Sequence, residues 1–258
     1  MTTSLTPTTA LDRLRRLNVV AAVLHAASAV AVVVLSNSFA LPIVARYMAG
    51  PPGTTKFQLV HLTSLRMAWL VAAFFALSAL AHGLVAGPLH ARYAKNLEQH
   101  RNPFRWLEYS LSSSLMIVAI AQLTGIADVA ALVALVGVNA AMIGFGWLQE
   151  RYEAPGGSLL PFWLGCVAGV VPWLAIGVYL IGPGAHDHAP GFVYGIFVSL
   201  FVLFNCFALV QYLQYKKVGR FANYLVGEKT YLVLSLAAKS LLAWQIFAST
   251  LAVSSATH

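Results

Sequence analysis

Two ionisable side chains stand inside otherwise apolar stretches of this sequence, and their types give them a chemistry. Lys239 lies near the middle of the segment Gly227–Val253, in which it is the only charged residue after Lys229. Glu108 lies within the stretch FRWLEYSLSSSLMIVAIAQ. An ammonium group inside a bilayer costs about 2.5–3.5 kcal/mol on insertion scales, so Lys239 requires an anionic partner or a chemical use. A neutral lysine amine is also the nucleophile that condenses with an aldehyde to form a Schiff base.

The composition indicates the environment in which this pair must act. Of the 258 residues, 59% are hydrophobic and 9% are charged, with a mean hydropathy of +0.76. Soluble domains contain roughly 25% charged residues, so the chain is predicted to be a polytopic α-helical membrane protein. Cys166 and Cys206 lie in apolar segments and indicate no disulfide framework. The sequence also lacks a recognisable constellation for hydrolysis, phosphoryl transfer or redox chemistry, so we expect a protein that is not an enzyme.

Seven apolar segments are predicted to span the membrane as a single domain, residues 1–258, after an N-terminal tail of residues 1–13. Asn102 and Pro103 are typical of an N-cap and a first helical position, and Pro172 is expected to kink its helix. The predicted helices are Leu14–Leu35, Leu65–Ala86, Pro103–Thr124, Ala127–Leu148, Pro161–Ile181, Phe192–Tyr215 and Gly227–Val253.

The connection between the first two predicted helices, residues 36–58, is long and is too polar and too rich in Pro and Gly to span. Its apolar FALPIVARYM, followed by GPPG and TTKFQ, predicts a hairpin that lies over one end of the bundle. A disordered loop is the alternative.

The basic residues predict the orientation of the chain. One side of the predicted helices carries Arg46, Lys56 and Arg66 only. The other side carries Arg13, Arg15, Arg16, Arg92, Lys95, Arg101, Arg105, Arg151, Lys216, Lys217, Arg220 and Lys229. Because positively charged connections remain in the cytoplasm, we expect a multi-pass protein of the cell membrane with a cytoplasmic N-terminus and an extracellular C-terminus. The basic charges belong to these connections, so the sequence does not indicate nucleic-acid binding.

Helix geometry places Lys239 and Glu108 at similar depths. Glu108 is expected about 24 Å from the extracellular end of its helix and Lys239 about 18 Å from the end of its own, at 1.5 Å per residue. The carboxylate then lies about one helical turn closer to the cytoplasm, within reach of an extended lysine side chain. The other seven acidic residues are expected at helix ends or in loops. A buried ion pair that only specifies helix packing is an equal alternative at this point.

Hydroxyl and imidazole groups are expected beside this pair. Ser235 precedes Lys239 by four residues and Ser112 follows Glu108 by four, so each shares a helix face with its neighbour. The helix directions place His25, His82 and Ser78 in the cytoplasmic half, where imidazoles form a group able to hold a proton. Each histidine taken alone is more often a satisfied buried polar residue. The HxxxH and CxxC spacings of a zinc site do not accompany them.

Seven spans with a lysine in the middle of the last resemble a retinal-binding rhodopsin, and the inverted orientation sets the chain apart from other microbial and animal rhodopsins. The sequence closely resembles the heliorhodopsin family over nearly the whole chain. The resemblance rests on GPPGTT (Gly50–Thr55), FRWLEYSLSSS (Phe104–Ser114), IAQLTGIADV (Ile120–Val129), FGWLQE (Phe145–Glu150), LLPFWLGCVAGVVPW (Leu159–Trp173), PGFVYGI (Pro190–Ile196), FALVQYLQYK (Phe207–Lys216) and VLSLAAKSLLAWQIF (Val233–Phe247).

The resemblance implies a role for each matching position. Lys239 would carry all-trans retinal as a protonated Schiff base, with Glu108 as its counterion. Ser78, Ser112 and Ser235 would hydrogen-bond around that pair, and His25 and His82 would accept the proton after light absorption. The residues expected to line the retinal pocket are Met116, Asn139, Met142, Trp163 and Phe207. The family also implies a homodimer whose extracellular face is capped by the hairpin.

The expected function is a slow light sensor that signals to an unidentified cytoplasmic partner. A pump would use a second intramembrane carboxylate across the Schiff base, and the extracellular halves of the two helices offer none. Arg105 and Glu150 could form a polar cavity near the cytoplasmic end. The alternatives are a light-driven transporter or channel, and a membrane protein without photochemistry in which Lys239 and Glu108 only lock two helices together.

Overall fold

The computed structural model describes residues 7–182 and 189–256, and the fold of this part of the chain is mostly helical. A two-stranded sheet and a short 3₁₀ helix, η1 (Gly219–Ala222), accompany the α-helices. The α-helices are α1 (Pro7–Val34), α2 (Met67–Ala86), α3 (His90–Glu98), α4 (Pro103–Leu123), α5 (Val129–Tyr152), α6 (Leu160–Ile181), α7 (Gly191–Tyr215) and α8 (Tyr224–Ala256).

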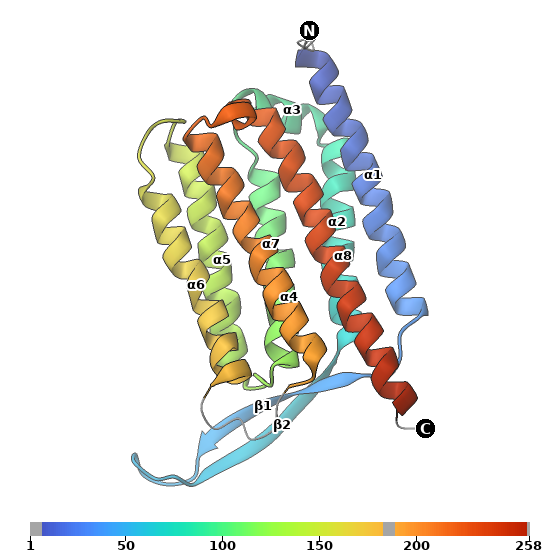
Figure 1. Cartoon of the computed structure of the whole chain (residues 1–258), viewed down its shortest axis with the longest axis vertical. Coiled ribbons are helices and arrows are strands. Elements are labelled where there is room, and N and C mark those ends of the chain that lie inside the picture. Colours follow the sequence, from blue (N-terminus) through green and yellow to red (C-terminus); the bar gives the residue numbers. More distant parts are fainter. Residues whose placement is uncertain (1–6, 183–188, 257–258) are drawn as a thin grey trace.

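The long helices form one bundle, and α4 lies inside it (Figure 1). It contacts α2, α5, α6 and α7, while α8 packs against α7, α1 and α2. We call the end at which α1 begins the N-terminal end, and the end at which α8 finishes the hairpin end. The two ends of the chain thus lie at opposite ends of the bundle (Figure 1).

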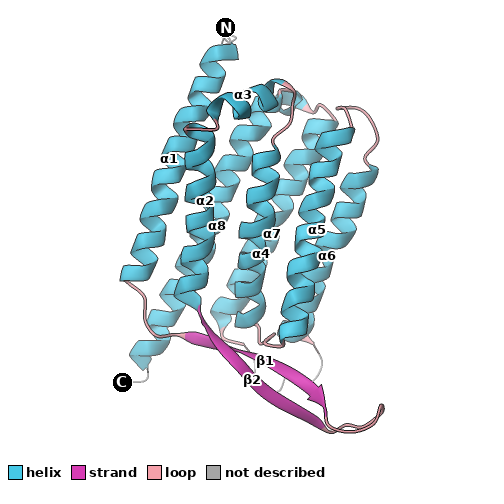
Figure 2. Cartoon of the chain, turned by 180° about the vertical axis from the view of Figure 1, so that it is seen from behind, coloured by secondary structure: helices cyan, strands magenta, loops and turns pink. Residues whose placement is uncertain are grey.

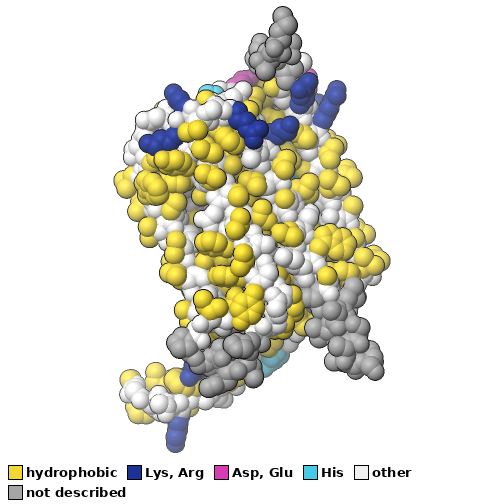
Figure 3. All heavy atoms as spheres, viewed as in Figure 1, with side chains coloured by type: hydrophobic (Ala, Val, Ile, Leu, Met, Phe, Trp, Pro, Cys, Tyr) yellow, Lys and Arg dark blue, Asp and Glu magenta, His cyan; other side chains and the backbone are white. Residues whose placement is uncertain are grey.

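Six of the described helices are long and apolar enough to cross a membrane, namely α1, α2, α5, α6, α7 and α8. Hydrophobic side chains cover the middle of the molecular surface, and Lys and Arg gather at the N-terminal end (Figure 3). Helix α4 has 21 residues but is more polar than the other six because it contains Arg105, Glu108 and three consecutive serines. Its position in the bundle explains this composition, since its polar side chains point to other helices rather than to lipid.

Local signals explain where α4 and α5 begin. The side chain of Asn102 accepts a hydrogen bond from the Arg105 backbone N–H, and Pro103 occupies the first helical position, as the sequence predicts. Asp128 caps α5 in the same way by accepting from the N–H groups of Ala130 and Ala131. Between the two helices, Gly125 adopts a φ of 95°, which a residue without a Cβ tolerates best.

The connection after α1 is a β-hairpin that crosses the hairpin end of the bundle (Figure 2). Strands β1 (Ala40–Met48) and β2 (Phe57–Arg66) pair antiparallel, with a bulge between Ile43 and Val44. The Val44 N–H donates to the Ala127 carbonyl at 2.9 Å, which anchors the hairpin to the turn between α4 and α5. The predicted connection, residues 36–58, was too short, because β2 continues to Arg66 and α2 starts only at Met67.

Two other expectations need correction. The connection after α2 contains helix α3, which buries Tyr93 and Leu97 against the bundle. Helix α5 extends to Tyr152, one turn beyond its predicted end, so Glu150 lies within a helix.

The main hydrophobic core surrounds the half of α4 that is nearer the hairpin end. It joins side chains from α2, α4, α5, α6, α7 and α8, which include Phe74, Ile117, Ile176, Leu200 and Leu242. This packing fixes the helix faces from which the polar residues of the centre project.

Candidate functional site

Lys239 and Glu108 form a direct ion pair in the centre of the bundle. Lys239 Nζ lies 2.8 Å from Glu108 Oε1, and the two residues are 2% and 7% exposed. The ammonium also donates to Ser235 Oγ at 2.7 Å, one turn earlier in α8. Ser78 Oγ of α2 donates to Glu108 Oε1 at 2.5 Å. Each charge therefore has a partner of opposite sign and a hydroxyl, which a buried pair requires.

Two histidines lie beside the pair, on the side of the N-terminal end. The rings of His25 from α1 and His82 from α2 stack with their centroids 5.5 Å apart. His82 Nδ1 lies 2.7 Å from Asn18 Oδ1. Both ring nitrogens of the buried His25, and Nε2 of His82, have no hydrogen-bond partner within the described part of the chain. These three nitrogens give the cluster a capacity to accept or donate protons that no described group uses.

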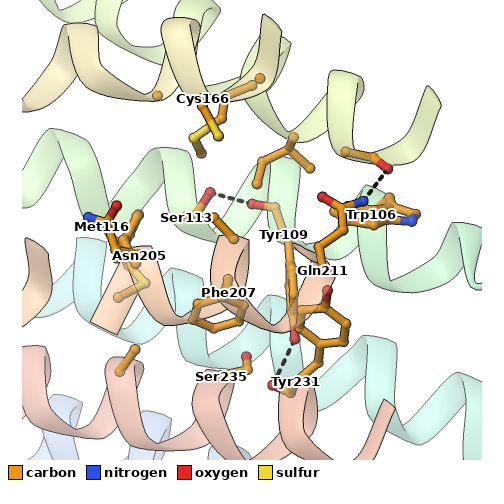
Figure 4. Close-up of a pocket in the computed structure, with 18 of the residues that line it drawn as sticks. Trp106, Tyr109, Ser113, Met116, Cys166, Asn205, Phe207, Gln211, Tyr231 and Ser235 are labelled. Carbon is orange, nitrogen blue, oxygen red and sulfur yellow. Dashed lines mark hydrogen bonds between the residues drawn. The ribbon is translucent and has the colours of Figure 1, made fainter. Parts of the chain in front are cut away.

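An elongated cavity extends from the lysine to α6. It has a volume of about 230 Å³ and a mostly apolar lining. Tyr109 from α4, Phe207 from α7 and Tyr231 from α8 converge on it (Figure 4). The Tyr109 hydroxyl donates to the Tyr231 carbonyl at 2.9 Å, and the Tyr109 ring packs edge-on against Phe207 at 5.3 Å. An apolar slot with one reactive polar end is the form of a site for a long apolar ligand.

Besides Ser235 and Lys239, four of the residues predicted near the ligand line this cavity, namely Ser112, Met116, Met142 and Phe207. The Ser112 hydroxyl is buried and has no hydrogen-bond partner among the described residues. Ser235 and Lys239 complete the polar end of the cavity.

Two predicted pocket residues do not line the cavity. Trp163 is 55% exposed on the outer face of α6, where it packs against Phe162 and Tyr212. Asn139 is buried, but its amide donates to the hydroxyl groups of Ser113 and Ser114 at 2.8 and 3.0 Å. Asn139 therefore ties α5 to α4 and lies behind the cavity wall.

The structure adds lining residues that the sequence reasoning missed. Tyr109, Trp173 and Phe204 contribute aromatic walls, and Gly165 and Gly169 form part of the α6 wall. A Cβ on Gly169 would approach the Met142 sulfur to 2.7 Å, so a larger residue would force Met142 to move. Two glycines four residues apart in an apolar helix indicate close helix packing, so the sequence alone could have indicated this part of the wall.

A second buried ion cluster lies nearer the N-terminal end. Arg105 Nη2 pairs with Glu150 Oε1 at 2.7 Å, and Arg105 Nη1 pairs with Glu228. Glu150 also accepts from Trp106 Nε1 at 2.5 Å and from the Tyr224 hydroxyl at 2.9 Å. The expectation that Glu108 is the only acidic residue within a helix is therefore wrong, because Glu150 and Glu228 are both buried inside the bundle.

Two further cavities adjoin this cluster, and Arg105 lines both. One of about 40 Å³ touches both Glu108 and Glu228, and Asn18, His82 and Tyr93 also line it. Burial raises the pKa of the Tyr93 phenol, so its hydroxyl keeps its proton at neutral pH. The predicted cavity at Arg105 and Glu150 has a volume of about 290 Å³ and is lined by polar residues. Polar groups therefore continue from the ion pair to the N-terminal end.

The opposite direction is mostly apolar, with the polar Gln122 and Thr124 buried only near the hairpin end of α4. Between Lys239 and the hairpin, the buried side chains of α4 and α8 include Ile117, Ile120, Leu242 and Ile246. No buried carboxylate of the described residues lies there. Among the same residues, no group of three or more His, Cys, Asp or Glu side chains is placed to hold a metal ion.

The chain is similar to a known family over most of its length. The model of the heliorhodopsin family matches residues 14–251. No curated protein sequence matches the chain.

Two solved structures share the fold. A light-driven proton pump from Leptosphaeria maculans is 13% identical, with a TM-score of 0.65 over 93% of this chain and 96% of that chain. A cyanorhodopsin from the cyanobacterium Tolypothrix sp. NIES-4075 is 15% identical, with a TM-score of 0.58 over 95% of both chains. At these identities the likeness concerns the fold alone.

Proposed function

The chain belongs to the heliorhodopsin family, and we propose that it is a light-sensing photoreceptor that holds all-trans retinal on Lys239. The single observation that carries this proposal is the position of Lys239, whose Nζ lies at the polar end of an apolar, aromatic cavity and beside a buried carboxylate. When bound, retinal supplies the absorption of visible light and the isomerisation from all-trans to 13-cis.

The residues around the cavity fit such a group. The walls are apolar and aromatic, as an elongated polyene requires, and the buried Ser112 hydroxyl has no partner among the described residues. We propose that this hydroxyl and that of Ser235 bond around Nζ of the occupied site. Met116, Met142 and Phe207 would contact the chain of the chromophore, whereas Asn139 and Trp163 would not.

The ion pair gives Glu108 its proposed role. A positive charge at Lys239 Nζ is stabilised by the carboxylate 2.8 Å away, because water does not screen the interaction at this depth. Ser78 holds Glu108 Oε1 in this position. Glu108 is therefore the proposed counterion of a cation held on Lys239.

His25 and His82 are the proposed acceptors of the proton that leaves Nζ after illumination. Their free ring nitrogens and the small cavity that joins His82 to Glu108 support this role. The hydrogen bond that His82 Nδ1–H donates to Asn18 Oδ1 would hold that ring in place. In this way a proton that leaves Lys239 Nζ can stay near Glu108 and later return to Nζ.

The proposed topology has seven spans, with α4 as the seventh beside the six apolar helices. Helix α4 supports this because it is long enough and runs through the interior of the bundle. The basic residues at the N-terminal end favour a cytoplasmic N-terminus by the positive-inside rule. The hairpin would then cap the extracellular face, and the C-terminus would be extracellular. We also propose, from the family, a homodimer and a cytoplasmic signalling partner.

A sensor is favoured over an ion pump or channel by the asymmetry of the interior. Polar groups continue from Glu108 to the N-terminal end, whereas the buried side chains on the path to the hairpin end are mostly apolar and include no carboxylate among the described residues. A pump would use proton-binding groups on both sides of Nζ. The solved structure from Leptosphaeria maculans is a light-driven proton pump, so a light-driven transporter is the second candidate.

The two candidates differ in what light does to sealed vesicles. Protein loaded with retinal is reconstituted into vesicles, and absorbance and internal pH are recorded together during illumination. We expect a slow, reversible absorbance change without a sustained pH change or current. A sustained light-driven current would establish the transporter instead.

A further inference from the structure

A basic groove lies on the outside of the bundle at its N-terminal end, between α3, the start of α4 and the end of α5. It has a volume of about 480 Å³, and its walls contain the side chains of Arg92, Arg101 and Arg151. None of these three side chains forms an ion pair or a hydrogen bond with another residue of the described ranges. Three unpaired guanidinium groups that line one groove repel one another, and an anion bound between them would offset this repulsion.

The groove keeps its positive charge even though a carboxylate reaches it. Glu150 lies in the wall, but Arg105 pairs with it at 2.7 Å and Trp106 and the Asn102 backbone donate to it. Arg105 also pairs with Glu228, so it offsets the charge of Glu150 only in part, and the groove has three guanidinium groups against this one partly offset carboxylate. The amides of Asn96 and Gln99 add neutral hydrogen-bonding groups to the same wall.

The remaining wall is apolar and aromatic, and it continues onto the outer surface of α5. Trp147 is 42% exposed and Tyr152 is 75% exposed, and Leu148 is exposed beside them. Trp and Tyr are enriched where the membrane meets water, and α5 is one of the helices able to span it. The groove is thus positively charged at the level of the headgroups and apolar toward the acyl chains.

We propose that this groove binds the headgroup of an anionic phospholipid. Arg92, Arg101 and Arg151 hold the phosphate oxygens, since guanidinium groups match phosphate in geometry and charge. Trp147 and Leu148 contact the upper part of the acyl chains. Basic pockets between spanning helices are suited to such headgroups. The inference needs only that the chain lies in a membrane, and it is independent of the chromophore.

The experiment is a lipid titration of the purified full-length protein in a neutral detergent, followed by thermal unfolding. Phosphatidylglycerol is the anionic probe, phosphatidylcholine the zwitterionic probe and glycerol phosphate the soluble one. We expect phosphatidylglycerol alone to raise the melting temperature in a saturable way. The triple variant Arg92→Gln, Arg101→Gln, Arg151→Gln should lose about 100-fold in apparent affinity, since each basic residue near a membrane contributes a factor of about five.

The matched control removes the same charge from the same end of the bundle. Lys216, Lys217 and Arg220 are exposed and lie outside the groove, so the triple Gln variant at these positions should keep its affinity within about twofold. The single variant Arg92→Gln, on the edge of the groove formed by α3, should lose about fivefold even if the triple variant does not fold. An equal loss in the control variant, equal stabilisation by phosphatidylcholine, or equal stabilisation by glycerol phosphate would each overturn the proposal.

Discussion

Lys239 Nζ and Glu108 Oε1 lie 2.8 Å apart although 131 residues separate them in the chain. Helix α8 supplies the cation and α4 the anion, and Ser235 and Ser78 each bond to one partner. The cavity opens from Lys239 toward α6. Adding or removing a positive charge at Lys239 Nζ therefore changes the interaction with Glu108 most strongly.

Glu108→Gln should shift the visible band of the retinal-loaded protein to longer wavelength. The carboxylate stabilises a positive charge at Lys239 Nζ, and a neutral amide stabilises it less. Absorbance spectra across a pH titration measure both the band and the pH at which the band changes. The control is Glu98→Gln, at an exposed carboxylate of α3. If Glu108→Gln left the band and its pH midpoint unchanged, the counterion assignment would be wrong.

In the protein without retinal, Ser78→Ala and Ser112→Ala should have different effects on the free energy of unfolding. Ser78 bonds to a buried carboxylate, and such bonds contribute about 1.5–3 kcal/mol, so its removal should lower the free energy of unfolding by that amount. The Ser112 hydroxyl has no partner in the described ranges, so Ser112→Ala should change it by less than about 1 kcal/mol. Denaturant unfolding compares the two variants. Equal losses would contradict the hydrogen-bond assignment.

Arg105→Met should destabilise the protein by about 3–5 kcal/mol, because it leaves the buried carboxylates of Glu150 and Glu228 without their cation. Thermal unfolding measures the loss, and Arg220→Met, at an exposed arginine, is the control. Adding Glu228→Gln to Arg105→Met should recover part of the stability, since one unpaired charge is removed. A double variant as unstable as the sum of both single variants would argue against a coupled cluster.

Phe207→Ala and Trp163→Ala test the outline of the cavity. Phe207 lines it and contacts Tyr109, whereas Trp163 packs on the outer face of α6. We expect Phe207→Ala to shift the visible band or weaken retinal uptake and Trp163→Ala to leave both unchanged. Spectra recorded during retinal titration provide the measurement, and the reverse pattern would place the chromophore elsewhere.

The long helices of the described part of the chain and the central ion pair could be predicted from the sequence for identifiable reasons. Most of these helices are apolar runs bounded on at least one side by Pro, Gly or a capping residue, and the more polar α4 begins after the N-cap Asn102. The pairing of Lys239 with Glu108 follows from depth, because helical rise converts sequence position into distance from the membrane surface.

Three features could not be predicted, and each has a physical reason. Helix α3 has nine residues, too few for its pattern to be distinguished from a polar loop. Glu150 and Glu228 lie near the ends of apolar runs, where solvated charges are also expected, so their burial depends on Arg105 reaching them from another helix. Trp163 was expected in the pocket, but it is exposed on the outer face of α6, and the sequence of an apolar helix does not show which face turns to lipid.

The most direct measurement of the central claim is the visible spectrum of the purified protein with and without added all-trans retinal, for the native chain and for Lys239→Ala. A second variant, Lys239→Ala with Glu108→Gln, removes both charges and controls for an unpaired buried carboxylate. We predict a visible band in the native protein that is absent from both variants. A native protein that stays colourless, or a band that persists without Lys239, would contradict the account.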